Sequence, residues 1–359
     1  MNEIVKRLLS WFAENARDLP WRRTRDPYAI WVSEVMLQQT QVKTVLPYWE
    51  RWMQALPTIS ALARARPEKI HKLWEGLGYY TRVRNMQRAA KMIESEHGGK
   101  FPARFEEVLA LPGIGRYTAG AICSIAFNQP KPLLDGNVIR VLTRVFGVAG
   151  NPREGRVNAR LWDLAESLVH HAACSPERAS QTHPASSFNQ SLMELGALVC
   201  VPKTPECPQC PLKSHCVAFR TGRADSLPHL PARAKPIQRR FAAFVAARRG
   251  RFLVRQRPAG AVNAHLWEFP NAELIHGNGD AQHTAQTILG VAPITLEPLC
   301  TLRHSITRYR ITLDAFRIRG ECQSKIADGP GSGRWLTPLE LRKLPFTSAH
   351  KRILQLVAG

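Results

Sequence analysis

The chain has 359 residues, 44% of them hydrophobic, which suits two domains with buried cores. Its 50 Lys and Arg against 28 Asp and Glu give a formal net charge of +22, which favours a polyanionic partner, nucleic acid before an anionic membrane surface. Charges are scattered through residues 1–21 and no stretch reaches the ~20 apolar residues of a membrane span, so we expect no signal peptide, no membrane segment, and a cytoplasmic location with reduced thiols.

Most of residues 1–220 carries apolar residues at three- and four-residue steps, which predicts helices. The segments with this pattern are 31–53, 105–111, 116–127, 137–148, 159–173 and 188–200. Pro and Gly separate them, and the polar stretch 174–187 predicts a loop. We therefore expect a mainly α domain over residues 1–220.

Asp26-Pro27 has the residue types of a helix start, and Glu34 falls on the helix that follows. Its neighbours three and four residues away are Ile30, Trp31, Leu37 and Gln38. A carboxylate on such a mostly apolar face is costly when charged, so its pKa should rise and allow general acid catalysis near neutral pH. The alternative is a helix-edge Glu paired with a cation such as Arg22 or Lys43.

Gly113 and Gly115, in "LPGIGRYTAG", lie between two predicted helices. Glycine permits a positive φ and the close approach of another surface. The free N–H groups at the start of the second helix favour an anion, which in a basic chain suggests a DNA phosphate bound without sequence preference. An ordinary helix connection with Gly as C-cap is the alternative.

Asp135 precedes the predicted helix at 137–148, where capping that helix is its default role. A cap is also a fixed, ionised carboxylate. An ionised Asp facing a protonated Glu is the arrangement that cleaves an acetal-like C–O or C–N bond. Glu34 would protonate the leaving group, and Asp135 would stabilise the sugar cation.

Four of the eight cysteines, Cys200, Cys207, Cys210 and Cys216, fall within 17 positions with gaps of six, two and five residues. The intervening residues are Pro, Lys, Gln and Ser rather than core types, which argues against four unrelated buried cysteines. Four thiolates fit either zinc or an iron–sulfur cluster, and the spacing does not separate the two.

Residues 221–238 are rich in Pro and Arg and predict a linker. Beyond it, residues 239–359 predict a smaller α+β domain. Its expected elements are two strands around a tight turn in 241–258, more strands in 294–318 and a helix at 348–359.

Five patterns, in this order, resemble the endonuclease-III-like helix–hairpin–helix superfamily of DNA glycosylases. They are "WVSEVMLQQTQV", "GLGYYTRVRN", "LPGIGRYTAGAI", "LDGNVIRVLTR" and the four cysteines. "LPWR" at 19–22, "SEVMLQQTQV" and a C-terminal extension with "LWEFP" are similar to the A/G-specific adenine DNA glycosylases. The resemblance covers nearly the whole chain. It implies a glycosylase domain at 1–220, with a [4Fe–4S] cluster loop at 200–216, and a Nudix-like lesion-recognition domain at 239–359.

That family removes adenine mispaired with 8-oxoguanine, or with G, by flipping the adenine out of the double helix into a pocket. The resemblance therefore implies a base-excision-repair hydrolase whose partner is double-stranded DNA containing A·8-oxoguanine or A·G mispairs. We expect a monomer without a membrane partner, in a bacterial cytoplasm and associated with the nucleoid.

The resemblance also assigns roles to single residues. Glu34 matches the catalytic acid, Asp135 the family's aspartate and Asn137 an assisting polar residue. Adenine-pocket positions fall at Trp21, Arg22, Gln39 and Gln190. Gln38 and Tyr79 match residues that wedge into the duplex, and Cys200, Cys207, Cys210 and Cys216 match the ligands of a [4Fe–4S] cluster.

Tyr117 distinguishes this chain from relatives that also cut the strand, which resemble it but carry Lys at this position. An amine there attacks the sugar carbon and forms a Schiff base, which a phenol cannot do. Tyr117 can still order Glu34 or a water molecule, so we expect a monofunctional glycosylase.

The Nudix-like domain departs from its relatives in two places. Segment 271–290 lacks the acidic run of the pyrophosphatases, so we expect a reader of DNA and not a second hydrolase. Relatives usually carry Phe-Ser-His in the loop that meets 8-oxoguanine, where this chain has Ile306, Thr307 and Arg308. We expect the Thr307 hydroxyl to read the lesion and Arg308 to suit phosphate.

Two other functions fit part of the pattern. An endonuclease-III-type glycosylase and AP lyase for oxidised pyrimidines would share the helical motifs, but Tyr117 and the second domain argue against it. A non-enzymatic iron–sulfur DNA-binding redox sensor explains the cysteines, the charge and the hairpin. It leaves Glu34 and Asp135 without a role.

Overall fold

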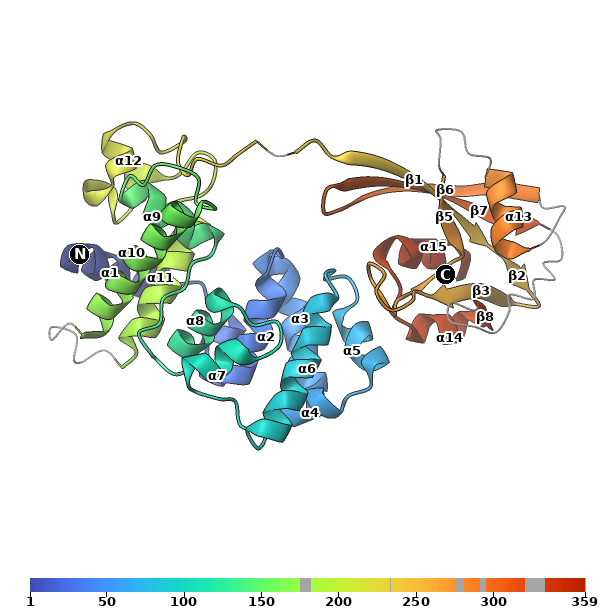
Figure 1. The fold of residues 1–359 in the computed structure, drawn as a ribbon, viewed down its shortest axis with the longest axis horizontal. Helices are drawn as coiled ribbons and strands as arrows, with labels where there is room; N and C mark the ends of the chain where they lie inside the picture. The colour runs from blue at the N-terminus through green and yellow to red at the C-terminus, as the bar shows by residue number, and fades with distance from the viewer. Residues whose placement is uncertain (175–181, 233, 275–280, 291–294, 320–332, 359) are drawn as a thin grey trace. The chain divides into compact units, whose positions relative to one another are not determined.

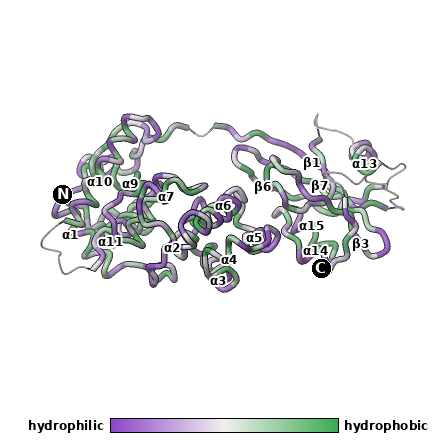
Figure 2. Tube along the Cα trace, turned by 60° about the horizontal axis from the view of Figure 1, so that its bottom comes forward, coloured by the Kyte–Doolittle hydropathy of each residue, from purple (hydrophilic) through white to green (hydrophobic). Residues whose placement is uncertain are grey.

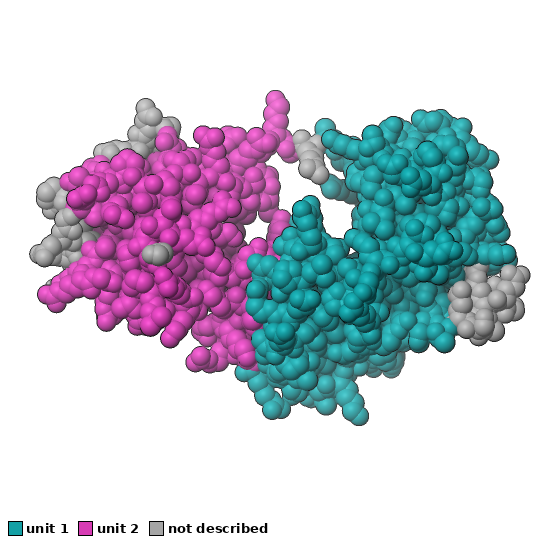
Figure 3. Space-filling view, turned by 180° about the vertical axis from the view of Figure 1, so that it is seen from behind, with its two compact units in different colours: residues 1–64, 85–232 teal, residues 65–84, 233–359 magenta. Residues whose placement is uncertain are grey.

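The computed structural model describes residues 1–174, 182–232, 234–274, 281–290, 295–319 and 333–358 (Figure 1). The chain divides into two compact units, which Figure 3 colours separately. Unit 1 comprises 1–64 and 85–232, and unit 2 comprises 65–84 and 233–359. Unit 1 is helical and unit 2 combines strands with helices, so the predicted fold class is confirmed. None of the helices in the described ranges has the length and apolar character needed to cross a membrane.

Unit 1 is built from short and medium helices joined by tight turns. They are α1 (Asn2–Asn15), η1 (Pro20–Arg22), α2 (Pro27–Leu37), α3 (Val42–Ala55), α4 (Ile59–Arg64), α6 (Thr81–Glu96, which starts in unit 2), α7 (Phe105–Ala110), α8 (Arg116–Ile125), α9 (Gly136–Val145), α10 (Gly155–Cys174), α11 (Pro184–Leu198), η3 (Cys207–Gln209), η4 (Lys213–His215) and α12 (Val217–Arg220).

A large hydrophobic core of unit 1 joins α1, α9, α10 and α11. Along these helices hydrophobic and hydrophilic residues alternate, as expected for elements with one buried face (Figure 2). The core holds α9 and α11 against each other. The predicted site residues Asp135 and Asn137 lie at the start of α9, and Gln190 lies on α11.

The stretch 31–53, predicted as continuously helical, forms two helices with a turn at residues 38–41. Gln39 has a φ of +59°, in the left-handed region that ends a right-handed helix. The apolar period continues across the turn, so periodicity alone did not reveal it. The turn places Gln38 and Gln39 directly after the helix that carries Glu34. Of the loop predicted at 174–187, Cys174 ends α10 and residues 184–187 begin α11, while 175–181 lie outside the described residues.

Unit 2 contains one helix from the middle of the chain, α5 (Pro67–Trp74), and the C-terminal elements. These are β1 (Ile237–Val245), β2 (Ala247–Arg248), β3 (Arg251–Gln256), β4 (Trp267–Glu268), β5 (Asn271–Glu273), α13 (Ala281–Leu289), β6 (Thr295–Ile306), β7 (Tyr309–Arg319), β8 (Gly333–Leu336), α14 (Pro338–Lys343) and α15 (Ser348–Ala358).

The strands form two sheets. In the first, the order is β5-β1-β7-β6, with β1 and β7 parallel and the other pairs antiparallel. In the second, β3 pairs with β2, β4 and β8. The hairpin predicted in 241–258 therefore consists of β2 and β3, while β1 joins the other sheet. Helices α13 and α15 cover opposite faces of β1, because Ala242 and Phe244 pack with α13 residues and Ala243 and Val245 with α15 residues.

Candidate active site

Glu34 lies near the end of α2 in a buried environment. The helix starts at the predicted cap, because the Asp26 carboxylate accepts a hydrogen bond from the Tyr28 N–H at 3.0 Å. Only 6% of Glu34 is exposed. Burial raises the pKa of Glu34 to about 7, although a hydrogen bond from Tyr117 acts in the opposite direction. The expected burial and raised pKa of this carboxyl group are both present.

Tyr117 is the hydrogen-bond partner of Glu34. Its hydroxyl donates to Oε2 of Glu34 at 2.6 Å across a sequence separation of 83 residues. The contact arises because α2 and α8 pack together and Tyr117 lies in the first turn of α8. Burial and the neighbouring carboxylates raise the pKa of Tyr117 well above its usual value, so the phenol remains a neutral donor. Glu34 is therefore bonded to a phenol and not to the cations considered as an alternative.

Asp135 caps α9, as predicted. Its Oδ1 accepts the Val138 N–H at 2.7 Å, and its Oδ2 accepts the side-chain amide of Asn137 at 3.0 Å. Arg140, one turn further on, donates to the side-chain oxygen Oδ1 of Asn137 at 2.8 Å. A chain of hydrogen bonds thus orients both oxygens of the Asp135 carboxylate.

Glu34 and Asp135 form an electrostatically coupled pair. Burial raises the pKa of Asp135 overall, and its bonds with Val138 and Asn137 and the charge of Arg140 limit that rise. The Asp135 charge in turn raises the pKa of Glu34. Hydrogen bonds to a carboxylate favour its ionised form, and Asp135 accepts two N–H donors where Glu34 accepts one O–H donor. Asp135 is therefore the group that ionises first, and Glu34 keeps its proton longer.

Glu194 is a second buried carboxylate, and no motif in the sequence marks it. It lies on α11, its side chain is 1% exposed, and it accepts paired hydrogen bonds from Arg17 and Arg22 at 2.7–3.0 Å. Burial alone would raise its pKa, but the two guanidinium groups lower it to about 2. Glu194 fixes the predicted pocket residue Arg22. No sequence signal indicated this pairing, because 172 positions separate the partners.

The other predicted pocket and wedge residues of unit 1 have separate local partners. Trp21 is buried and packs edge-on against Trp49, with ring centroids 5.9 Å apart. Gln190 donates to the Ser186 hydroxyl at 3.1 Å. Gln38 contacts the hydroxyl of Thr118, the residue after Tyr117, at 3.5 Å. Gln39 is exposed in the turn between α2 and α3.

The two glycines of the hairpin differ. Gly113 has a φ of +80°, and a Cβ there would lie 2.6 Å from the Cβ of Asn85, so conformation and space both require glycine. Gly115 caps α8 with a φ of −100°, which any residue adopts, so a positive φ at this position is wrong. A Cβ on Gly115 would meet no atom within 4 Å, and Gly115 and Arg116 are exposed at the start of α8.

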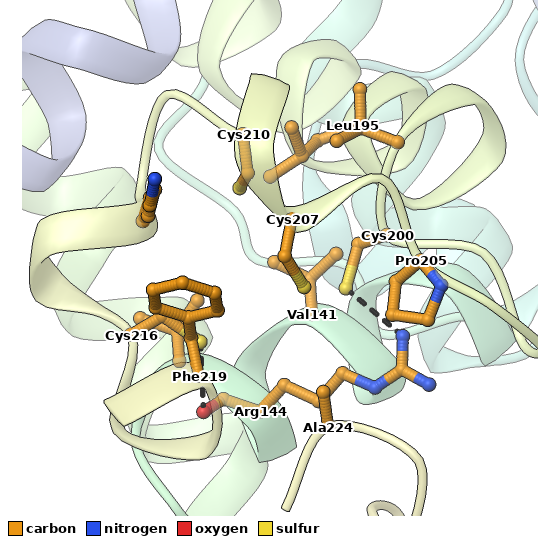
Figure 4. Close-up of a pocket in the computed structure, with 13 residues that line it drawn as sticks. Val141, Arg144, Leu195, Cys200, Pro205, Cys207, Cys210, Cys216, Phe219 and Ala224 are labelled. Carbon is orange, nitrogen blue, oxygen red and sulfur yellow. Dashed lines mark hydrogen bonds between the residues drawn. The ribbon is translucent and has the colours of Figure 1, made fainter. Parts of the chain in front are cut away.

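The four clustered cysteines line one pocket beside α9 and α11 (Figure 4). Arg144 of α9 donates to Sγ of Cys200 at 3.3 Å, and the Cys216 thiol donates to the Arg144 carbonyl at 3.4 Å. In the ranges that the structure describes, no three His, Cys, Asp or Glu side chains surround a single metal position. A four-iron cluster is held by four separate thiolates and does not require such a group.

Two arginines of α9 join the cysteine loop to the rest of unit 1. Arg144 also donates to the carbonyl groups of Val201, Pro202 and Leu227. Arg140 donates to the carbonyl of Cys200 at 2.6 Å. Since Arg140 also bonds Asn137, one side chain contacts both the cysteine loop and the hydrogen-bond chain at Asp135.

Three predicted DNA-contact residues belong to unit 2. Tyr79 is 48% exposed and has a φ of +47°. Thr307 and Arg308 form the turn between β6 and β7, where Thr307 has a φ of +51°. The Thr307 hydroxyl donates to the Ile306 carbonyl at 2.7 Å, and the Arg308 guanidinium lies over the Tyr309 ring at 5.3 Å.

Comparison with known proteins matches both parts of the chain. The model of the HhH-GPD superfamily of base excision DNA repair proteins matches residues 32–167, and that of the NUDIX domain matches residues 242–356. A solved thermostable thymine-DNA glycosylase is 27% identical with a TM-score of 0.53, covering 61% of this chain and 95% of that one.

Curated relatives extend the match over nearly the full length. The adenine DNA glycosylase of Rattus norvegicus is 37% identical, covering 98% of this chain and 77% of its own. That of Homo sapiens is 35% identical, covering 98% of this chain and 73% of its own. This chain belongs to the adenine DNA glycosylase family, and it is an enzyme that hydrolyses N-glycosyl bonds.

Proposed function

We propose that this glycosylase removes adenine from A·8-oxoguanine and A·G mispairs in double-stranded DNA and leaves the sugar–phosphate strand intact. The observation that carries the proposal is the hydrogen-bonded pair of the buried Glu34 and the partly buried Tyr117. It combines a carboxyl group whose pKa is about 7 with a neutral phenol at hydrogen-bonding distance. The first group can donate a proton at neutral pH, and the second cannot act as an amine nucleophile.

In this proposal Glu34 acts as the general acid. Its proton passes to N7 of the flipped adenine, the C1′–N9 bond breaks, and the bonding electrons leave with the base. The Glu34 carboxylate then accepts a proton from the water that attacks C1′. General acid catalysis of this kind contributes typically ~10²–10⁴-fold to the rate.

Asp135 stabilises the oxocarbenium-like sugar that forms as the bond breaks. A fixed negative charge is effective because it needs no reorganisation when the positive charge develops. The Val138 N–H and the Asn137 amide hold the carboxylate in place, and Arg140 holds Asn137. Asn137 and Arg140 are thus positioning residues for the aspartate.

Tyr117 limits the reaction to hydrolysis. Strand cleavage by a glycosylase requires an amine that attacks the sugar and forms a Schiff base. The phenol at this position is hydrogen-bonded to Glu34, and burial keeps it protonated. The product should therefore be an abasic site in an intact strand.

We also propose that Cys200, Cys207, Cys210 and Cys216 hold a [4Fe–4S] cluster. Two observations support the fit: the four cysteines line one pocket, and Arg144 donates to Sγ of Cys200, as suits a thiolate. The cluster would cross-link the 200–216 loop. That loop presents the exposed Lys203 and Lys213, whose charges suit the DNA backbone.

The proposed DNA contacts lie in both units. In unit 1 the start of α8 at Gly115 offers N–H groups and the Arg116 charge to a phosphate. Gln38 and Tyr79 would wedge into the duplex beside the lesion, and Thr307 and Arg308 would read the opposite strand. These roles rest on the match to the family's motifs.

A glycosylase assay on duplexes with A opposite 8-oxoguanine, G or T tests the proposal. We expect adenine release from the first two, strand breakage only after alkali or heat, and no adduct trapped by borohydride. Glu34→Gln should bind the mispair but release base at least ~10²-fold more slowly, whereas Glu14→Gln, an exposed control on α1, should match the wild type. Full turnover by Glu34→Gln, or a trapped covalent adduct, would contradict the mechanism.

A further inference from the structure

Segment 65–84 lies between two stretches of unit 1 in sequence but packs with the C-terminal sheet domain (Figure 3). It contains α5 and the turn that carries Tyr79. Two contacts join this segment to the loop before β4. The His71 ring stacks on the His265 ring at 6.3 Å, and Arg84 donates to the Ala264 carbonyl at 3.3 Å. Burial lowers the pKa of His71 to about 4, so the stacked His71 ring is neutral.

Glu75, the residue that follows α5, makes a buried polar contact with the corner between α14 and α15. Its side chain is 4% exposed. Oε1 accepts the backbone N–H of Phe346 at 2.8 Å, and Oε2 accepts Lys351 at 2.7 Å and Lys72 at 3.0 Å. Lys72 also donates to the Leu344 carbonyl at 2.9 Å, so the carboxylate and its partners form one connected network.

The network keeps Glu75 ionised in a buried position. Burial raises its pKa, but the bonds from Lys351 and the Phe346 N–H and the charge of Lys72 outweigh burial and lower it overall. A buried carboxylate is stable only with such partners, so separating α5 from the α14–α15 corner would leave charges unpaired. Glu75 therefore favours one arrangement of α5 against the α14–α15 corner.

Trp74, the last residue of α5, and Arg82 hold the turn that follows Glu75. Trp74 donates to the Gly78 carbonyl at 2.9 Å, and Arg82 donates to the Leu77 carbonyl at 3.0 Å. The Arg82 guanidinium lies over the Trp74 ring at 5.3 Å and over the Tyr79 ring at 5.5 Å. The place of the exposed Tyr79 ring is thus set by the end of α5.

We propose that Glu75 is a positioning residue that links the wedge Tyr79 to the compact unit that also carries the Thr307 turn. This inference rests on the wedge and reader roles proposed above. Insertion of Tyr79 on the adenine side and inspection of the opposite base by the β6–β7 turn would then be coupled. A mispair that the turn reads well would favour insertion of the wedge through this connection.

The experiment compares Glu75→Gln, Lys351→Met and the double variant with the wild type. Glu68→Gln, an exposed acidic residue on the same helix, is the control. Hydrogen exchange without DNA should show the amides of 70–80 opening faster, by about tenfold, in each single variant, which is the scale of one charge-assisted hydrogen bond. Amide exchange in the double variant should be little faster than in either single variant, because both substitutions remove the same contact between Glu75 and Lys351.

Single-turnover excision from A·8-oxoguanine and A·G duplexes supplies the functional arm. The rate ratio between the two duplexes should fall by about tenfold in the single variants, while the slower A·G rate stays unchanged. The proposal would be overturned if the effects of the two substitutions on amide exchange were additive. It would also be overturned if amide exchange in 70–80 became faster while the ratio of the two excision rates stayed unchanged. The exchange arm uses no substrate, so absence of adenine excision by the wild type would instead overturn the proposed function.

Discussion

Tyr117→Phe removes the hydroxyl that donates to Oε2 of Glu34 and keeps the aromatic ring, which packs against the hydrophobic core of unit 1. In the wild type this bond lowers the pKa of Glu34 against the effect of burial. Its loss leaves only the charge of Arg22 to oppose the effects of burial and of Asp135, so the carboxyl group should hold its proton to higher pH. A hydrogen bond to a charged group contributes ~1.5–3 kcal/mol, and 1.36 kcal/mol corresponds to one pH unit, so the midpoint should rise by about 1–2 pH units.

The assay is single-turnover adenine excision between pH 5 and pH 9.5. The general acid is active when protonated, so the wild-type rate should fall as pH rises through about 7. The descending limb of Tyr117→Phe should lie at higher pH, with similar rates at pH 6. Tyr28→Phe, which removes a buried hydroxyl bonded to the Leu56 carbonyl, should leave the limb in place. An unmoved or lower midpoint in Tyr117→Phe would refute the assignment of Glu34 as the acid.

Three further predictions concern other parts of the molecule. The two arginines lower the pKa of Glu194 in the folded protein to about 2, from an ordinary value of 4.5. The ionised carboxylate therefore stabilises the fold above about pH 4.5, and this stabilisation is lost as the pH falls toward 2. Glu194→Gln should lose about 3 kcal/mol at pH 7 and show a flatter dependence between pH 5 and 2 in urea unfolding; equal stability at pH 7 would contradict this. Cys207→Ser should lose the brown colour of an iron–sulfur protein, which visible absorbance measures. It should also bind all duplexes more weakly, which DNA affinity measured at several salt concentrations tests. Thr307→Ala should narrow the preference for A·8-oxoguanine over A·G by ~1–3 kcal/mol, and an unchanged rate ratio would exclude Thr307 as the reader.

The sequence predicted features whose causes are local. Asp26 and Asp135 cap helices because an N-cap depends on a side chain and the N–H groups two or three residues later. The burial of Glu34 followed from its neighbours on the same helix, since one turn of α2 places apolar residues on both sides. Such features need no knowledge of tertiary packing.

Features that depend on distant residues could not be predicted in this way. The bond between Tyr117 and Glu34 and the pairing of Arg22 with Glu194 exist only after α2, α8 and α11 have packed. The turn at 38–41 interrupts an apolar period that continues through it. The attachment of α5 to the C-terminal sheet domain depends on Glu75 finding partners more than 270 positions away.

The contact at Tyr117 has two consequences that cannot be separated. A lysine at this position would place a cation against Glu34, and a nearby opposite charge favours the ionised carboxylate. Glu34 would then lack, near neutral pH, the proton that departure of adenine requires. A tyrosine supplies one hydrogen bond without a charge, so burial still holds the pKa of Glu34 at about 7. In the proposed mechanism, the side chain that prevents Schiff-base formation therefore also keeps the acid protonated, and hydrolysis without strand cleavage follows from this one contact.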